Sequence, residues 1–170
     1  MPKTLEKRLG RNYFAKKANA VAQGILGMYI VRVFSNGSTV RGRITETGAY
    51  EGGNTSESRE GMLYAPGTIF LMPFRGHTSL NIATEDADIP SCVEIRAAEF
   101  MFGERIRKVE TPYRLAKALG LDVNGRSKKN LDGIILGKIL RIEGTPFREK
   151  IKKYTPKSRS GNCVAYYAIK

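Results

Sequence analysis

The spacing of apolar residues near the start of the chain predicts a helix followed by a β-hairpin. Apolar residues at helical spacing, with polar residues between them, favour an amphipathic helix over residues 14–25. Residues 28–34 and 40–47 are rich in strand-forming side chains and flank a Ser, Asn and Gly sequence at 35–38. Two such runs around a turn sequence predict a hairpin.

The middle of the chain predicts a sheet that is interrupted by one irregular segment. Residues 52–61 are rich in Gly, Ser and Asn and follow no periodicity, which is typical of an exposed loop of the kind that often carries function. Three short apolar runs then predict strands over residues 69–74, 79–84 and 91–98, with turns at 75–77 and 86–88.

The last third of the chain is more polar. Thr111 and Pro112 open a short predicted helix, a loop is expected at 128–133, and an apolar run covers 134–142. A basic segment follows at 146–159. Because the strands occur in hairpins and not in β-α-β alternation, we expect one mixed α/β (α+β) domain over residues 1–170, with a mainly antiparallel sheet and flanking helices.

Charge points to a polyanionic partner. The 170 residues include 29 Lys plus Arg against 16 Asp plus Glu, a formal net charge of +13. A hydrophobic content of 41% excludes a disordered basic tail. Phosphate contacts would give such a domain affinity without sequence information. The sequence contains none of the usual helix-turn-helix, RNP1, KH or zinc-finger motifs, so charge alone does not identify the module.

Metal and membrane sites are not expected. Cys92 and Cys163 stand 71 positions apart and, with His77 as the single histidine, make no zinc-ligand pattern. No apolar stretch approaches the ~20 residues of a membrane span, and no apolar segment follows the basic N-terminus. We therefore expect a soluble protein that lies in the nucleus if the source is eukaryotic and in the cytoplasm otherwise.

Several short motifs, taken in order, resemble the alkyladenine (3-methyladenine) DNA glycosylase family of the mammalian type. They are Asn12-Tyr13-Phe14, Leu26-Gly27, Gly42-Arg43-Ile44-Thr45-Glu46-Thr47, Ala49-Tyr50, Pro66-Gly67-Thr68, Leu80-Asn81-Ile82, Ile95-Arg96-Ala97 and the run from Leu115 to Leu121. The resemblance fades after about residue 142. It implies a single curved-sheet domain that flips a damaged purine out of duplex DNA and hydrolyses its N-glycosidic bond in base excision repair. It also implies a monomer that needs no cofactor.

The resemblance assigns roles to individual residues. Tyr50 matches the tyrosine that stacks on the flipped base, Asn81 the asparagine that screens the base edge, and Arg96 an arginine of the active-site region. Met72 stands in place of a second stacking tyrosine. At the following corner of the hairpin, Arg75 takes the place of the intercalating tyrosine, with His77 beside it. Arg can stack through its guanidinium plane, and Met offers apolar surface without an aromatic face.

The general base of the family is missing from its usual place. The family strand reads E-T-E-A-Y, and its second glutamate activates the attacking water; in this chain that position is Gly48. The family's loop histidine is also replaced, with Glu57 nearest. Glu46 shares a strand face with position 48 but lies ~6.6–6.8 Å away along the strand. We predict Glu46 as the catalytic acid, with Glu57 as the second candidate and Glu51 as the third.

Three functions remain open from the sequence. The first is a monofunctional glycosylase that uses water as the nucleophile, and that is most effective on cationic methylpurines because their charge already activates the leaving base. The second is a catalytically impaired member of the family that only binds damaged DNA, which Gly48 favours. The third is a basic RNA-associated protein.

Overall fold

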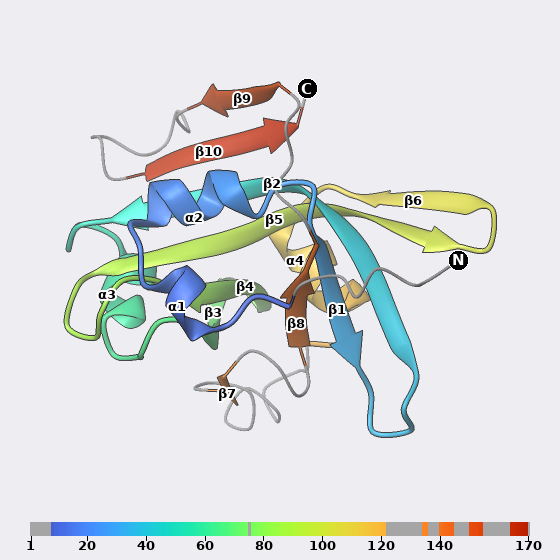
Figure 1. Cartoon of the computed structure of the whole chain (residues 1–170), viewed down its shortest axis with the longest axis horizontal. Coiled ribbons are helices and arrows are strands. Elements are labelled where there is room, and N and C mark those ends of the chain that lie inside the picture. Colours follow the sequence, from blue (N-terminus) through green and yellow to red (C-terminus); the bar gives the residue numbers. More distant parts are fainter. Residues whose placement is uncertain are drawn as a thin grey trace.

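The computed structural model describes residues 8–74, 76–121, 134–135, 140–144, 150–154 and 164–169. Within these ranges four short helices accompany ten strands (Figure 1). In chain order they are α1 (Arg11–Phe14), α2 (Ala18–Gly24), β1 (Tyr29–Val33), β2 (Thr39–Glu51), α3 (Ser56–Gly61), β3 (Thr68–Phe74), β4 (His77–Ala83), β5 (Ser91–Phe102), β6 (Arg105–Val109), α4 (Pro112–Ala118), β7 (Ile134–Ile135), β8 (Leu140–Glu143), β9 (Ile151–Tyr154) and β10 (Val164–Ile169).

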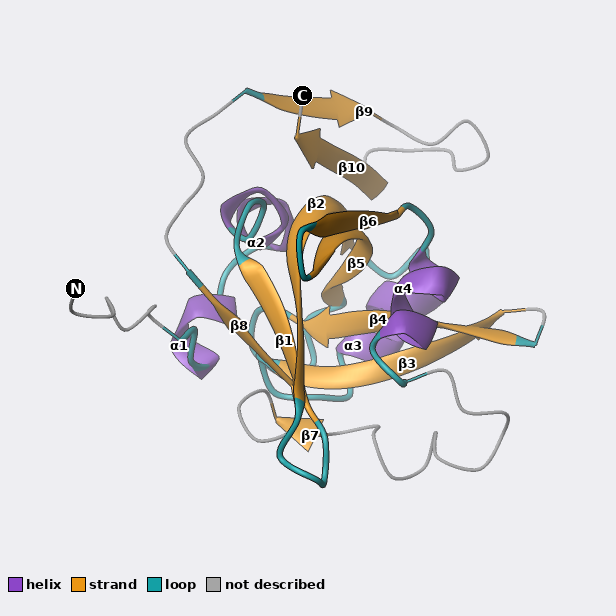
Figure 2. Ribbon diagram, turned by 90° about the vertical axis from the view of Figure 1, so that its right-hand side faces the viewer, coloured by secondary structure: helices purple, strands orange, loops and turns teal. Residues whose placement is uncertain are grey.

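All ten strands join one antiparallel sheet that curls on itself. Its main path runs β7-β3-β4-β5-β2-β1-β8, with β6 paired to β5, and β10 paired to both β2 and β9. The two longest strands change partners along their length: β2 pairs with β1 at its start and with β10 at its end, and β5 passes from β4 to β6. Figure 2 shows the resulting curvature. The predicted mixed α/β fold with a curved antiparallel sheet is confirmed.

The main core lies between α2 and one face of β2 and β5 (Figure 1). The predicted helix over 14–25 is divided in the structure: α1 ends at Phe14, whose ring is fully buried, and α2 begins at Ala18. The buried face of α2 consists of Ala18, Val21 and Ala22, as the helical spacing required. Thr47 on β2 donates its hydroxyl to the carbonyl of Ala22 at 2.8 Å, which ties the helix to the sheet.

Two short helices, α3 and α4, pack against strands of the sheet and later border the candidate site. The predicted loop over 52–61 contains α3, whose N-cap Thr55 accepts a hydrogen bond from the amide of Ser58. The loop prediction was therefore wrong for residues 56–61. The helix expected after Thr111 is confirmed as α4, with Thr111 as its N-cap and Pro112 in its first turn.

Three strands were not predicted: β6, β10, and β9, which lies within the basic segment. β6 is exposed at every position except Val109, so it shows no alternation of buried and exposed residues, and it pairs with β5 in a hairpin. β10 follows the basic segment and closes the sheet against the end of β2. The predicted loop at 128–133 and most of the basic segment at 146–159 lie outside the described residues.

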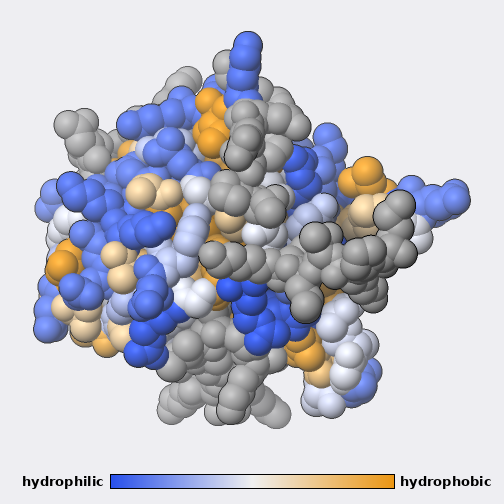
Figure 3. All heavy atoms as spheres, in the orientation of Figure 1, coloured by the Kyte–Doolittle hydropathy of each residue, from blue (hydrophilic) through white to orange (hydrophobic). Residues whose placement is uncertain are grey.

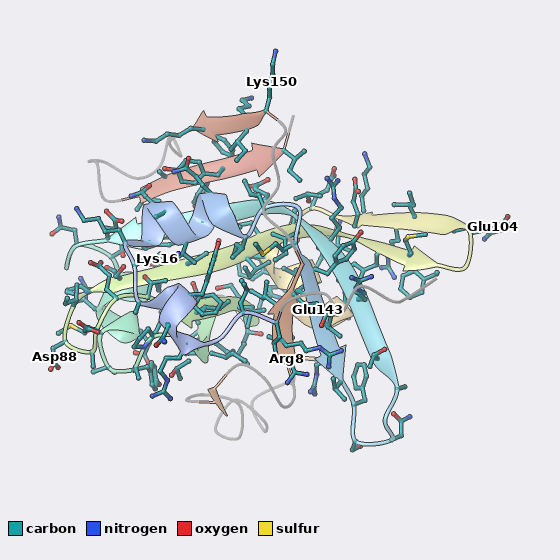
Figure 4. All side chains as sticks on the ribbon, viewed as in Figure 1. Arg8, Lys16, Asp88, Glu104, Glu143 and Lys150 are labelled. Atoms are coloured by element: carbon teal, nitrogen blue, oxygen red, sulfur yellow. The ribbon has the colours of Figure 1, made fainter. Side chains whose placement is uncertain are left out.

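The molecular surface over α1 and α2 is mainly hydrophilic, with apolar residues in scattered spots (Figure 3). Charged side chains project from the periphery: Glu104 lies at the tip of the β5–β6 hairpin and Lys150 at the start of β9 (Figure 4). Arg8 lies beside Glu143 of β8, to which it is joined by an isolated antiparallel bridge. Among the described residues, no helix has the length and apolar character that crossing a bilayer requires.

Candidate active site

A cavity of about 310 Å³ opens on the sheet face opposite α2. Its size falls in the ~300–1,000 Å³ range of small-molecule sites. Neighbouring residues of a strand point to opposite faces, so Val93 and Ile95 enter the main core while Glu94 and Arg96 face the cavity. The lining residues are Tyr50, Ser56, Glu57, Met72, Pro73, Ser79, Glu94, Arg96, Pro112, Tyr113 and Tyr166.

Arg96 is the cation at the centre of this wall. The register of β2 against β5 shifts on both sides of Glu46, which makes Arg96 an extra residue in β5 and re-aims its side chain. Its Nε donates to Glu46 Oε1 at 2.9 Å, and its Nη1 donates to Glu94 Oε1. The guanidinium carbon lies 3.7 Å from the centre of the Tyr166 ring. Arg96 therefore links two carboxylates and an aromatic ring.

Glu94 is the most deeply buried acid of the cavity, with 5% of its surface exposed. Burial raises the pKa of its carboxyl above the ordinary value of 4.5; the Arg96 guanidinium opposes this shift, the charge of Glu57 adds to it, and a hydrogen bond with Ser79 opposes it. In the sheet, Glu94 stands directly opposite Gly48 of β2 on one side and Asn81 of β4 on the other.

The three acids predicted from the sequence lie in different places. Glu51 accepts a hydrogen bond from the backbone amide of Asn19 at 3.0 Å and does not line the cavity. Glu57, in the first turn of α3, is buried and lines the cavity. Glu46 does not line it: its carboxylate accepts hydrogen bonds from Arg96 and from the hydroxyl of Tyr154 on β9. Burial raises the pKa of Tyr154, and the hydrogen bond to Glu46 raises it further. Glu46 therefore contacts the cavity wall through Arg96 and does not itself face the cavity.

Gly48 lies where three strands meet and where aromatic rings crowd the backbone. A Cβ at this position would lie 3.0 Å from Cδ1 and Cε1 of Tyr166, and 3.2 Å from Cε2 of Tyr50. Tyr50 is itself 1% exposed, and its hydroxyl lies 3.3 Å from that of Tyr166. Burial, and then the charge of Glu94, raise the pKa of Tyr50 above its ordinary value. The space that a side chain at 48 would use is therefore filled by the Tyr166 ring.

The remaining predicted residues lie in three places: in the cavity wall, directly behind that wall, and near the tip of the β3–β4 hairpin. Met72 lines the cavity, whereas Asn81 is fully buried beside it and donates Nδ2 to the Ser79 hydroxyl at 3.1 Å. His77 is exposed at the start of β4, and its ring centre lies 5.6 Å from that of Tyr113. Arg75 lies outside the described residues.

Seven of the eleven lining residues were not predicted from the sequence, and three of the seven carry a charge or an aromatic ring: Glu94, Tyr113 and Tyr166. Glu94 falls within a predicted strand and has the same parity as Arg96, so the alternation of that strand could have placed it on the same face. Tyr113 follows the predicted helix start. Tyr166 belongs to a strand that was not predicted, and none of the motifs that carry the resemblance includes it. Among the described residues, no group of three or more His, Cys, Asp or Glu side chains is arranged to hold a metal ion.

Comparison with known proteins identifies relatives along most of the chain. The family described as methylpurine-DNA glycosylase matches residues 12–160. A Synechococcus elongatus protein provisionally named 3-methyladenine DNA glycosylase is 37% identical over 133 residues, which cover 72% of this chain and 64% of that protein. The rat and human proteins named DNA-3-methyladenine glycosylase are each 33% identical, over 76% and 69% of this chain and over 42% and 43% of their own lengths. The chain thus spans about two fifths to two thirds of these relatives.

Proposed function

This chain belongs to the methylpurine-DNA glycosylase family, and we propose on that premise that it hydrolyses the N-glycosidic bond of alkylated purines in duplex DNA, as the first step of base excision repair. The observation that carries the proposal is the cavity beside Tyr50, because it joins aromatic surface, a cation and buried carboxylates in a space of small-molecule size.

The cavity suits a flipped purine. Stacking of a base on an aromatic ring contributes ~1–3 kcal/mol, which offsets part of the few kcal/mol that unstacking and unpairing cost. Tyr50 and Tyr166 provide rings on the inner wall, and Met72 provides polarisable surface from β3. We assign Tyr50, Met72 and Arg96 to base binding, with Asn81 acting behind the wall through its contact with Ser79.

The β3–β4 hairpin is the segment best placed to open the duplex. It projects beyond α4 in Figure 2, His77 is the first residue of its second strand, and Arg75 precedes His77 by two positions in the sequence. We propose that these two side chains enter the base stack while the net charge of +13 supplies phosphate contacts elsewhere. The protein acts as a monomer on DNA, in the nucleus of a eukaryote or the cytoplasm of a prokaryote.

The reaction uses water as its nucleophile. As a water oxygen forms a bond to C1′ of the sugar, the bond from C1′ to the purine nitrogen breaks and its electron pair leaves with the base. A cationic methylpurine becomes neutral in this step, and the water proton passes to a carboxylate. Of the acids predicted from the sequence, Glu57 belongs to the cavity wall, while Glu46 holds Arg96.

A second function, recognition of damage without release of the base, is favoured by Gly48. The position at which the family's strand carries its catalytic glutamate has no side chain in this protein, and the Tyr166 ring fills the space. Such a protein would keep the cavity and the DNA contacts but not the hydrolysis.

Single-turnover assays with excess protein separate these functions. We expect release of free 7-methylguanine from a methylated duplex, none from the unmodified duplex, and an abasic site that stays uncleaved and is not trapped by borohydride. Tight binding to the lesion duplex without base release would instead identify a damage-binding protein. Equal binding to damaged, undamaged and RNA duplexes without release would rule out both functions.

A further inference from the structure

We propose that Glu94 is the general base of this enzyme, so that the catalytic carboxylate has moved across the sheet from position 48 of β2 to the directly opposite position of β5. This inference rests on the proposed glycosylase function and adds to it the residue that activates water. The sequence alone favoured Glu46, which lies on the same strand as Gly48. The register of the sheet instead places Glu94 of the neighbouring strand β5 directly opposite Gly48.

The sheet register makes the exchange of positions geometrically simple. Gly48 and Glu94 form a pair in the antiparallel ladder of β2 and β5. Residues that pair in this way present their side chains on the same face, with Cβ atoms roughly 4.5–5.5 Å apart. Position 46 lies farther away, at ~6.6–6.8 Å along the strand, and its side chain is directed to Arg96 and Tyr154. A long side chain at 94 therefore projects on the same face as a long side chain at 48 would, into the cavity beside the Tyr166 ring.

Two further contacts support the exchange. A Cβ at position 48 would lie 3.0 Å from the Tyr166 ring, so this ring leaves little room for a side chain there. Glu94 lines the cavity beside the same ring. Arg96 binds one oxygen of Glu94 through Nη1 and is itself held by Glu46. The carboxylate is thus held in place by a partly buried cation, as a positioned base requires.

In the proposed step, Glu94 accepts one proton from the attacking water while the water oxygen bonds to C1′. The C1′–N bond breaks, its electron pair neutralises the methylated purine cation, and the sugar keeps the hydroxyl. The Glu94 carboxyl then returns its proton to solvent. Atoms and charge balance without any further reactant.

The surroundings of Glu94 also make its carboxylate a stronger base. Burial raises the pKa of its carboxyl, and a base is most effective when its pKa approaches the working pH. The titratable and charged groups that face it come from five elements: Tyr50 of β2, Glu57 of α3, Cys92 and Arg96 of β5, Tyr113 of α4 and Tyr166 of β10. Of these, Arg96 lowers the pKa of Glu94 and Glu57 raises it.

The test is single-turnover release of 7-methylguanine from duplex DNA between pH 5 and 9. We expect Glu94→Gln to slow release ~10²–10⁴-fold and to abolish the rise of rate with pH. Glu99→Gln is the matched control, because Glu99 lies on the same strand, pairs with Arg43 and Lys108, and stands outside the cavity. In Glu57→Gln, the inflection of the pH profile should move to lower pH, since the charge of Glu57 raises the pKa of Glu94.

Thermal unfolding and binding to the lesion duplex accompany each variant, and Glu94→Asp covers the case in which Glu94→Gln does not fold. The shorter acid should slow release at least tenfold and keep the pH inflection. Unchanged release or an unchanged pH inflection in folded Glu94→Gln, or unslowed release by Glu94→Asp, would overturn the role of Glu94 and leave the glycosylase function intact. If wild-type protein releases no base at all, the function fails and the role of Glu94 fails with it.

Discussion

Replacing Arg96 by Met should destabilise the protein strongly at neutral pH and much less in acid. Arg96 is the shared partner of Glu94 and Glu46, and the exposed fractions of the three side chains are 20%, 6% and 21%. Met retains the apolar stem that packs near Tyr166 but removes the charge. The change therefore leaves two mostly buried carboxylates without their common cation.

The magnitude follows from that burial. Removing one partner of a buried ion pair costs about 3–5 kcal/mol, because the remaining charge is uncompensated. For a chain of this size each kcal/mol lowers the melting temperature by about 2–4 °C, so the expected loss is about 6–20 °C at pH 8. Lys108→Met is the control, because the Lys108 side chain is 68% exposed and its Nζ lies 3.9 Å from Glu99 Oε1, a long distance for an ion pair. Such a surface pair contributes ~0–1 kcal/mol.

The pH dependence gives the sharper test. Arg96 opposes the burial that raises the pKa of Glu94, so its removal moves that pKa further above the value in the unfolded chain. An ionised carboxyl with a raised folded pKa destabilises the fold; the penalty is full above the folded pKa and disappears as pH falls toward the ordinary value of 4.5. Thermal unfolding at pH 8 and pH 5 should show the loss shrink in acid. An equal loss at both values, or one no larger than that of Lys108→Met, would refute the reasoning.

Three further outcomes follow from the same cavity. Tyr50→Leu should weaken binding to the lesion duplex by about 5- to 150-fold while Tyr50→Phe stays near wild type, because ring stacking contributes ~1–3 kcal/mol per base; equal losses in titrations of both variants would contradict a stacking role. The rate enhancement over uncatalysed hydrolysis should be smaller for hypoxanthine than for 7-methylguanine, because only 7-methylguanine is cationic before its bond to the sugar breaks. Equal rate enhancements for the two bases in single-turnover assays would argue against this. Gly48→Glu should lower stability by about 1–3 kcal/mol in denaturant unfolding, because its Cβ crowds the Tyr166 ring at 3.0 Å; undiminished stability would show that the ring moves aside freely.

The local patterns of the sequence were sufficient for the elements that bury one face. The helix that became α2 and the hairpin of β1 and β2 carry clear periodicities, and Thr111 with Pro112 marks the start of α4. β6 was not predicted because nearly all of its residues are exposed, so apolar and polar residues do not have to alternate along it. The short α3 escaped because six residues within a Gly and Ser-rich segment give too little periodicity to recognise.

The candidate site shows a different limit. Tyr50, Met72 and Arg96, to which the resemblance assigned roles at the base, line one cavity, and two of them, Tyr50 and Arg96, lie within the motifs that carry the resemblance. Their roles in base binding stay predictions. Glu94 could not be recognised from a motif, since its relation to Gly48 exists only in the pairing of β2 with β5. The roles of Glu46 and Glu57 as base remain predictions, and only the contacts distinguish them: one lines the cavity and the other holds Arg96.

The partner exchange along β2 affects how the pocket is assembled during synthesis. Residues Glu46 to Tyr50 pair with β10, so one wall of the cavity is contributed by residues more than a hundred positions later in the chain. Until β10 is made and docked, the late half of β2 is an unpaired strand edge, which is a site for mispairing and aggregation. A chain that ends before residue 164 would thus contain α2 and most of the strands. It would lack Tyr166 in the cavity wall and would keep an unpaired edge on β2 that favours aggregation.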